Sequence, residues 1–185
     1  MTLHSKNLKV VIPARYDSSR LPGKPLIDLC GKPMIIHVAD RVRRALPSTD
    51  IWIATDDNRI KKTVEDYGYS ALITSSKHES GSDRIGEVAT QLQWSDDSII
   101  LNVQGDEPIV NPEDIKTILL YNKKYPKRVV FGKTPCNEIE FNDFSKAKVV
   151  CSQSGRLMYS SRAGIPITNK GQFYSAQRAI WIYAF

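Results

Sequence analysis

Residues 10–26 read VVIPARYDSSRLPGKPL and join an apolar segment to a loop rich in positive charge. The apolar run at residues 8–12 has the length and β-branched content of a buried strand, and a proline ends it. Arg15, Arg20 and Lys24 follow within a short distance, among small residues whose backbone amides can approach a ligand. A strand that runs into such a loop predicts a binding site for phosphate groups.

The loop differs from two common phosphate-binding motifs. Around Lys24 it reads PGKP, without the first glycine of a P-loop and without a Ser or Thr after the lysine. No GxGxxG follows the strand, which excludes the dinucleotide-binding fingerprint. The alternative interpretation is a basic surface loop between two strands.

Beyond this loop, predicted strands alternate with predicted helices. One helix is capped by Asp56 or Asp57, and another begins at the Asn111 cap with a proline at its first position. His37 falls opposite the apolar face of its helix and is expected at the surface. The alternation predicts βαβ units, hence an α/β, Rossmann-like fold whose mostly parallel, twisted sheet is sandwiched by helices. The strands are expected at residues 51–55, 71–74, 98–103 and 129–133.

The pattern changes after Cys136. A β-hairpin extension is predicted from residues 148–152 and 156–160, which flank a Gln-Ser-Gly turn. A loop at residues 164–172 and a last strand at residues 179–185 follow. The chain is therefore expected to form one domain, residues 1–185, with a different architecture in its last quarter.

Composition narrows the classes of protein. At 185 residues and 41% hydrophobic residues, the chain is long enough to bury a core. It contains no apolar run long enough to cross a membrane, and the three cysteines form no CxxC, so we expect a cytoplasmic protein. The net charge of +6 is spread over ordinary helix positions, which argues against nucleic acid and fits a small anionic substrate.

Six segments, in order, carry a resemblance to a known family. The set resembles the CMP-Kdo synthetases (3-deoxy-manno-octulosonate cytidylyltransferases), which have the sugar-nucleotidyltransferase fold. The resemblance is close to about Pro112 and looser afterwards. The segments are ARxxSxRLPGKPL at residues 14–26, GKPMI at 31–35, ATDD at 54–57, HxSGSDRI at 78–85, NVQGDEP at 102–108 and SRAxIP at 161–166.

The predicted site lies where strands end. In an open parallel sheet, ligands bind outside the carboxyl ends of the strands, and most of the motif residues follow such ends. The resemblance implies that Arg15 and Lys24 bind phosphates and stabilise the departing pyrophosphate. It also implies that Asp106 holds a catalytic Mg²⁺, although a turn aspartate bonded to its own backbone is the alternative.

Further binding residues follow from the same resemblance. Arg84 is unusual in the first turn of a helix, and contact with a nucleotide or with Asp83 would explain it; a surface arginine is the alternative. Arg162 suits the carboxylate of a sugar acid, and a surface ion pair is the alternative. His78 is left as a binding residue, because the reaction calls for no general base there. The nucleotide-binding set is Ala14, Arg15, Ser18, Lys24, Ser80, Gly81, Arg84 and Gln104, and the acceptor-binding set is Gln104, Arg162 and Tyr183.

The implied activity is transfer of CMP from CTP to Kdo or a close relative, for lipopolysaccharide or another surface glycan. The resemblance also implies a homodimer formed through the region after Cys136. Two departures leave the acceptor open: Ile167 stands where the family has tryptophan, and Ala179 precedes the last Ile-Trp where a histidine is usual. An amino-Kdo or a nonulosonic acid therefore stays open, and a hexose-1-phosphate nucleotidyltransferase is the competing enzyme.

The chain ends at Phe185 without a cap or a polar tail, so we expect that its C-terminal part is missing. The resemblance implies a second metal carboxylate downstream of that residue. A nucleotide-binding pseudoenzyme or a truncated relative is therefore the alternative from another functional class.

Overall fold

The computed structural model describes residues 7–17 and 21–185. These residues form two compact units. The first contains the described residues up to Val130 together with Ile182–Phe185, and the second is Phe131–Trp181. Among the residues described, no helix is both long and apolar enough to cross a bilayer.

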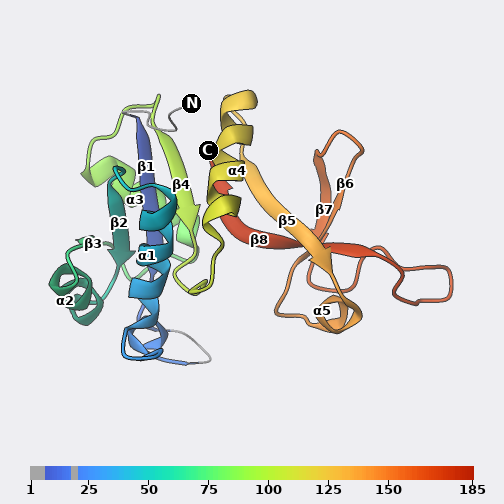
Figure 1. Ribbon diagram of the computed structural model, residues 1–185, viewed down its shortest axis with the longest axis horizontal. Helices are drawn as coiled ribbons and strands as arrows, with labels where there is room; N and C mark the ends of the chain where they lie inside the picture. The colour runs from blue at the N-terminus through green and yellow to red at the C-terminus, as the bar shows by residue number, and fades with distance from the viewer. Residues whose placement is uncertain (1–6, 18–20) are drawn as a thin grey trace. The chain divides into compact units, whose positions relative to one another are not determined.

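The first unit is built on a mostly parallel sheet, as predicted (Figure 1). Its strands lie in the order β3-β2-β1-β4, with all three neighbouring pairs parallel. The last residues of β8 then pair antiparallel with β4, from Leu101↔Ala184 to Val103↔Ile182. The strands are β1 (Leu8–Ala14), β2 (Ile51–Thr55), β3 (Ser70–Ile73), β4 (Ile99–Val103) and β8 (Ala176–Ala184).

Helices cover both faces of this sheet, with α1 in front of it and α3 behind it in Figure 1. Val11 of β1 packs against Ile85 and Val88 of α3. Val10 and Ile12 point to the opposite face of the sheet, because side chains alternate along a strand. The helices of the unit are α1 (Met34–Ala45), α2 (Asn58–Asp66), α3 (Gly81–Gln91), α4 (Pro112–Lys124) and the short 3₁₀-helix η1 (Lys24–Leu26).

The second unit is built on antiparallel strands. The predicted hairpin is present: β6 pairs with β7, and its register begins at Lys148↔Ser161. The first part of β8 pairs with β6 on the other side. Two small apolar clusters form its core, one around Phe141 and one around Val149. Its remaining elements are β5 (Val130–Cys136), α5 (Glu138–Asn142), β6 (Lys148–Cys151) and β7 (Leu157–Ser161).

A buried lysine holds this unit together. Lys148 has no exposed surface, and its Nζ donates hydrogen bonds to the carbonyl oxygens of Asp143 at 2.8 Å and Lys146 at 2.7 Å. A buried ammonium needs such acceptors, because burying an unpaired charge costs on the order of several kcal/mol of folding free energy. The lysine therefore ties the loop before β6 to the strand itself.

The structure also corrects several sequence expectations. Helix α5 was not predicted, although Asn137 and Glu140 form a capping box at its start. Strand β8 begins at Ala176, earlier than expected. His37 is half-buried instead of lying at the surface, and its Nε2 lies 2.7 Å from the carbonyl oxygen of Leu29. Each difference comes from a tertiary contact or a cap that apolar periodicity does not report.

Candidate active site

A pocket of about 540 Å³ lies at the carboxyl ends of β1 and β4, within the first unit. The signature loop, residues 14–26, is described at 14–17 and 21–26 and forms one wall. The N-terminus of α3 and the loop after β4 form the others. The lining residues are Pro13, Ala14, Arg15, Leu21, Lys24, Pro25, Met34, His78, Glu79, Ser80, Gly81, Arg84, Gln104, Gly105 and Asp106.

The two residues predicted to meet phosphate and metal are already in contact. The Nζ of Lys24 donates to Oδ2 of Asp106 at 2.9 Å, and both side chains are partly exposed. Arg15 is also exposed, and no hydrogen bond or ion pair joins its side chain to the described residues. Within this pocket the exposed Arg15 therefore lies beside the paired Lys24 and Asp106.

The backbone of the loop after β4 passes close to the end of β1, and this close approach requires glycine at residue 105. A Cβ on Gly105 would lie 2.6 Å from the carbonyl oxygen of Pro13 and 3.2 Å from Cδ1 of Ile35. A Cβ on Gly81 would lie 3.2 Å from Cγ of Pro13 and 3.4 Å from the side chain of Gln104. Both glycines therefore let neighbouring segments reach the end of β1.

Gly105→Ala should destabilise the protein by about 1–3 kcal/mol, because the backbone oxygen of Pro13 cannot swing aside as a flexible side chain can. The matched control is Gly86→Ala inside α3, where a Cβ meets nothing within 4 Å. That variant should gain up to about 1 kcal/mol from the higher helix propensity of alanine. Urea unfolding of both variants checks this, and equal stability of the two would contradict the close packing.

The N-terminus of α3 faces the pocket through Ser80 and Gly81. Ser80 caps the helix: its Oγ accepts from the backbone N–H of Asp83, and the Asp83 carboxylate accepts from the backbone N–H of Ser80. Unpaired backbone N–H groups and the positive end of the helix dipole favour an anion here. The cap and the predicted nucleotide contact thus fall on the same segment.

Of the alternatives considered for Arg84, the contact with Asp83 and the surface position are both wrong. Arg84 is buried, with its Nη2 donating to Oδ2 of Asp56 at 2.8 Å and its Nη1 donating to Oγ1 of Thr74 at 2.5 Å. Asp83 instead belongs to the helix cap. A buried cation needs a buried partner, and the strand end that carries Asp56 supplies one.

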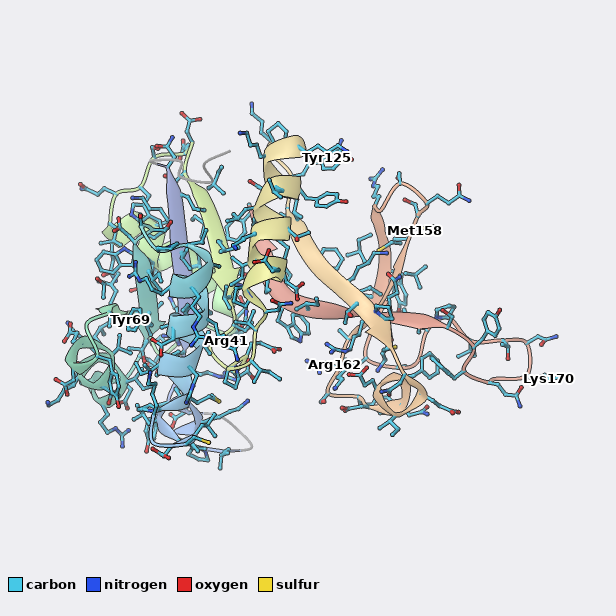
Figure 2. The ribbon with its side chains drawn as sticks, in the orientation of Figure 1. Arg41, Tyr69, Tyr125, Met158, Arg162 and Lys170 are labelled. Atoms are coloured by element: carbon cyan, nitrogen blue, oxygen red, sulfur yellow. The ribbon has the colours of Figure 1, made fainter. Side chains whose placement is uncertain are left out.

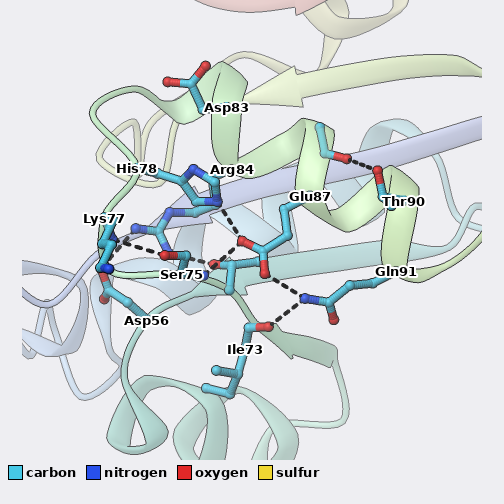
Figure 3. A network of polar contacts seen from close by, with 12 residues as sticks. Asp56, Ile73, Ser75, Lys77, His78, Asp83, Arg84, Glu87, Thr90 and Gln91 are labelled. Carbon is cyan, nitrogen blue, oxygen red and sulfur yellow. Dashed lines mark hydrogen bonds and ion pairs between the residues drawn. The ribbon is translucent and has the colours of Figure 1, made fainter.

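His78 lines the pocket and belongs to a polar network on the same wall (Figure 3). Its Nε2 lies 2.5 Å from Oε2 of Glu87. The backbone N–H of Ser75 also donates to that oxygen at 2.8 Å, and Gln91 bridges the carboxylate to the carbonyl oxygen of Ile73. The hydrogen bond from Ser75, with that from His78, lowers the pKa of Glu87 below its usual value. The network holds the loop after β3 against α3.

The remaining predicted residues lie elsewhere. Arg162 belongs to the second unit (Figure 2), where its Nη1 donates to the carbonyl oxygens of Phe144 and Ser145. Tyr183 lies on β8 opposite Asn102 of β4, and burial raises its pKa to about 12. Ser18 lies outside the described residues. The pocket thus collects Ala14, Arg15, Lys24, Ser80, Gly81, Arg84, Gln104 and Asp106 from the predicted set.

Comparisons with known proteins bear on the fold and the family of this chain. The profile of a family described as cytidylyltransferase matches residues 9–185. The 8-amino-3,8-dideoxy-manno-octulosonate cytidylyltransferase of Shewanella piezotolerans is 40% identical over 182 residues, which is 97% of this chain and 74% of that protein. The structure of a CMP:2-keto-3-deoxy-manno-octonic acid synthetase complexed with CTP has a TM-score of 0.87 at 38% identity, covering 97% of this chain and 74% of that one.

A more distant structure, a cytidylyltransferase from Leptospira borgpetersenii, shares the fold with a TM-score of 0.57 at 18% identity. It covers 65% of this chain and 50% of that chain. The fold, the family model and these relatives define a nucleotidyltransferase. The chain belongs to the cytidylyltransferase family, which confirms the resemblance carried by the six motifs.

Proposed function

We propose that this protein transfers CMP from CTP to an eight-carbon 3-deoxy sugar acid and releases pyrophosphate. The observation that carries the proposal is the pocket in which Arg15, Lys24 and Asp106 meet the N-terminus of α3. Two relatives named for Kdo-type acceptors, at 40% and 38% identity, support the acceptor class.

The chemistry is an in-line displacement at phosphorus. The anomeric hydroxyl oxygen of the acid forms a bond to the α-phosphorus of CTP, the bond to the bridging oxygen of pyrophosphate breaks, and the hydroxyl proton passes to solvent. Negative charge then grows on the leaving pyrophosphate. Lys24 and Arg15 would stabilise that charge, because both cations line the pocket and opposite charge near the leaving group lowers the energy of the transition state.

Asp106 would hold a Mg²⁺ that arrives with the nucleotide. The described residues contain no cluster of three acidic, His or Cys side chains that could hold a metal by themselves. A single carboxylate nevertheless fits Mg²⁺, which commonly takes one or two carboxylates and completes its shell with phosphate oxygens and water. When bound, the ion would neutralise phosphate charge and help to activate the acceptor hydroxyl.

The Lys24–Asp106 ion pair would couple the binding of CTP to the binding of Mg²⁺. Triphosphate oxygens compete with Asp106 for the Lys24 ammonium, since both accept charge-assisted hydrogen bonds from it. Nucleotide binding would therefore release the carboxylate, and an arriving cation could replace the ammonium beside it. Binding of CTP and of the metal should accordingly reinforce each other.

The acceptor is proposed to be Kdo or its 8-amino analogue. Arg162 is the candidate for its carboxylate: the side chain is exposed, and in the described structure only Nη1 is engaged, which leaves N–H groups for bidentate binding. Gln104 and Tyr183 remain candidates for its hydroxyl groups.

Pyrophosphate release tests the proposal directly. The protein with CTP, Mg²⁺ and either Kdo or 8-amino-Kdo should release pyrophosphate, and the better acceptor identifies the sugar acid. UTP with a hexose 1-phosphate should be a poor pair. Faster turnover of that pair would establish the competing enzyme, and CTP binding without any turnover would establish the binding-only alternative.

We also propose a homodimer formed through the region after Cys136. Strand β7 lies at an edge of its sheet, and Leu157, Met158 and Tyr159 are all exposed there. Figure 2 shows Met158 on this strand. An exposed apolar edge strand is a site for pairing with another chain. Sedimentation should show a dimer at micromolar concentration that Met158→Lys dissociates. Tyr121→Lys, at an exposed apolar position on α4, is the control; a monomeric unaltered protein would contradict the proposal.

The cytoplasm is the proposed location, because the proposed reaction requires CTP and CTP is available there. Recovery of the native protein in a cell fraction that lacks nucleoside triphosphates would contradict it.

A further inference from the structure

Asp56 joins two walls of the pocket without lining it. It follows directly after β2, and its carboxylate is only partly accessible. Oδ1 accepts from the backbone N–H of Tyr16 at 3.1 Å, and Oδ2 accepts from Nη2 of Arg84 at 2.8 Å. One oxygen therefore holds the signature loop and the other holds α3.

Arg84 extends the connection to a third segment. Its Nη1 donates to Oγ1 of Thr74, and that hydroxyl donates to the carbonyl oxygen of Thr55 at 3.1 Å. The Arg84 side chain is 4% exposed and that of Asp56 is 12% exposed. Although part of Arg84 borders the pocket, the two guanidinium nitrogens that these bonds occupy face the protein.

Tyr16 contacts both the loop before Lys24 and the side chain of Arg59, so restraining its backbone restrains the whole signature loop. Its carbonyl oxygen accepts from the backbone N–H of Gly23 at 2.8 Å, just before Lys24. Its ring lies under the Arg59 guanidinium, 3.5 Å from carbon to centroid. Gly23 has a φ of +70°, and a Cβ there would lie 3.2 Å from the Tyr16 ring. A hydrogen bond to the backbone of Tyr16 therefore restrains both the Arg15 and the Lys24 sides of the loop.

We propose that Asp56 and Arg84 are a positioning pair that sets the signature loop against the N-terminus of α3. In this assignment Arg84 acts on the nucleotide through Asp56 and Tyr16, and makes no essential contact with the nucleotide itself. The inference rests on the proposed nucleotide site and adds two residues that orient it.

Charge-neutral variants of each partner separate positioning from direct contact. Asp56→Asn keeps an acceptor for Tyr16 but presents an amide N–H₂ group to Arg84, so the ion pair is lost. Arg84→Met keeps an unbranched apolar stem and removes the guanidinium. If both act through one connection, each variant should weaken CTP binding by about 10- to 100-fold, the size typical of residues that orient binding groups. The double variant should bind no more weakly than the worse single variant, because the two losses are not additive.

A direct contact predicts a different pattern. If Arg84 bound the nucleotide itself, Asp56→Asn would free its guanidinium and leave CTP affinity unchanged or higher, whereas Arg84→Met alone would lose affinity. That pattern in calorimetric titration overturns the proposal. The same titration on the unaltered protein tests the proposed function: no CTP binding there rejects the nucleotide site, whereas equal binding by all variants rejects only the positioning pair.

Amide hydrogen exchange supplies a readout that general destabilisation would not produce. The backbone N–H of Tyr16 should exchange faster in the Arg84 variant, because Asp56 joins the two residues through one hydrogen bond to each. Asp40→Asn is the matched control. Asp40 is also a partly buried carboxylate with two donors, Lys32 at 2.6 Å and the Tyr69 hydroxyl at 2.6 Å, and it lies outside the pocket lining. It should lower the melting temperature without changing Tyr16 exchange or CTP affinity.

A single variant that fails to fold does not end the test. Removing one partner leaves a buried unpaired charge, whereas Asp56→Asn with Arg84→Met removes both charges together. The folded double variant should show fast Tyr16 exchange and weak CTP binding. Normal exchange and normal binding in that variant would overturn the proposal.

Discussion

Asp106→Asn should bind metal-free CTP at least as tightly as the unaltered protein and lose about a thousandfold or more of its turnover. Asparagine keeps the shape of the side chain but removes the charge that retains a hard cation. Loss of a metal ligand costs several kcal/mol of transition-state stabilisation, and each 1.36 kcal/mol is roughly tenfold in rate. CTP affinity should hold because the variant releases Lys24 from its 2.9 Å ion pair for the phosphates.

Binding of Mn²⁺, followed by electron paramagnetic resonance in the presence of CTP, checks the same assignment without turnover. Asp106→Asn should lose this binding. The matched control is Asp66→Asn, which also breaks an exposed lysine–aspartate pair, Lys62–Asp66 at 3.1 Å, but on α2 outside the pocket. Full activity of Asp106→Asn in Mg²⁺ would overturn the metal assignment.

Lys24→Met should weaken CTP binding by about 10- to 100-fold, because a charge-assisted hydrogen bond contributes roughly 1.5–3 kcal/mol. Turnover should fall further, since the ammonium also meets charge that grows on pyrophosphate. Methionine keeps most of the apolar stem, so the fold should persist. Without nucleotide the effect on Mn²⁺ should have the opposite sign: binding should strengthen, because Asp106 no longer faces an ammonium.

These opposite signs make the Lys24 experiment specific. Lys62→Met, the control from the surface pair on α2, should change neither CTP nor Mn²⁺ binding. Unchanged CTP affinity in Lys24→Met would reject the phosphate role, and so would a collapsed thermal transition. Weaker CTP binding with no gain in Mn²⁺ binding would reject only the competition between the ammonium and the metal.

Much of the first unit could be predicted because its signals are local. Apolar β-branched runs alternate with helices of period 3.6, and that alternation leads to a parallel sheet. Chain direction then places the loops after β1, β3 and β4 at one edge, since parallel strands end on the same side. Lys24 and Asp106 are 82 positions apart, yet this rule was enough to expect them in one site, and they form an ion pair.

Pairing of side chains could not be predicted in the same way. Asp56 and Asp57 are neighbours of the same type at a helix start, and either could have been the cap. The structure assigns the cap to Asp57, whose side chain accepts from the backbone N–H of Arg59, and leaves Asp56 for Arg84. The choice depends on which carboxylate faces α3, and this follows from the packing of three elements.

The sequence by itself determined the class of fold, the edge of the sheet where the pocket lies and the residue types gathered there. Strand period, chain direction and motif spacing are properties of short segments. Only the tertiary structure decided which charges are buried and what they bond. Lys148, in an ordinary hairpin strand, and Arg84, beside the aspartate that seemed its natural partner, both found acceptors elsewhere in the chain. A buried ion must satisfy its hydrogen bonds wherever the fold places acceptors, and that placement is set by contacts distant in sequence.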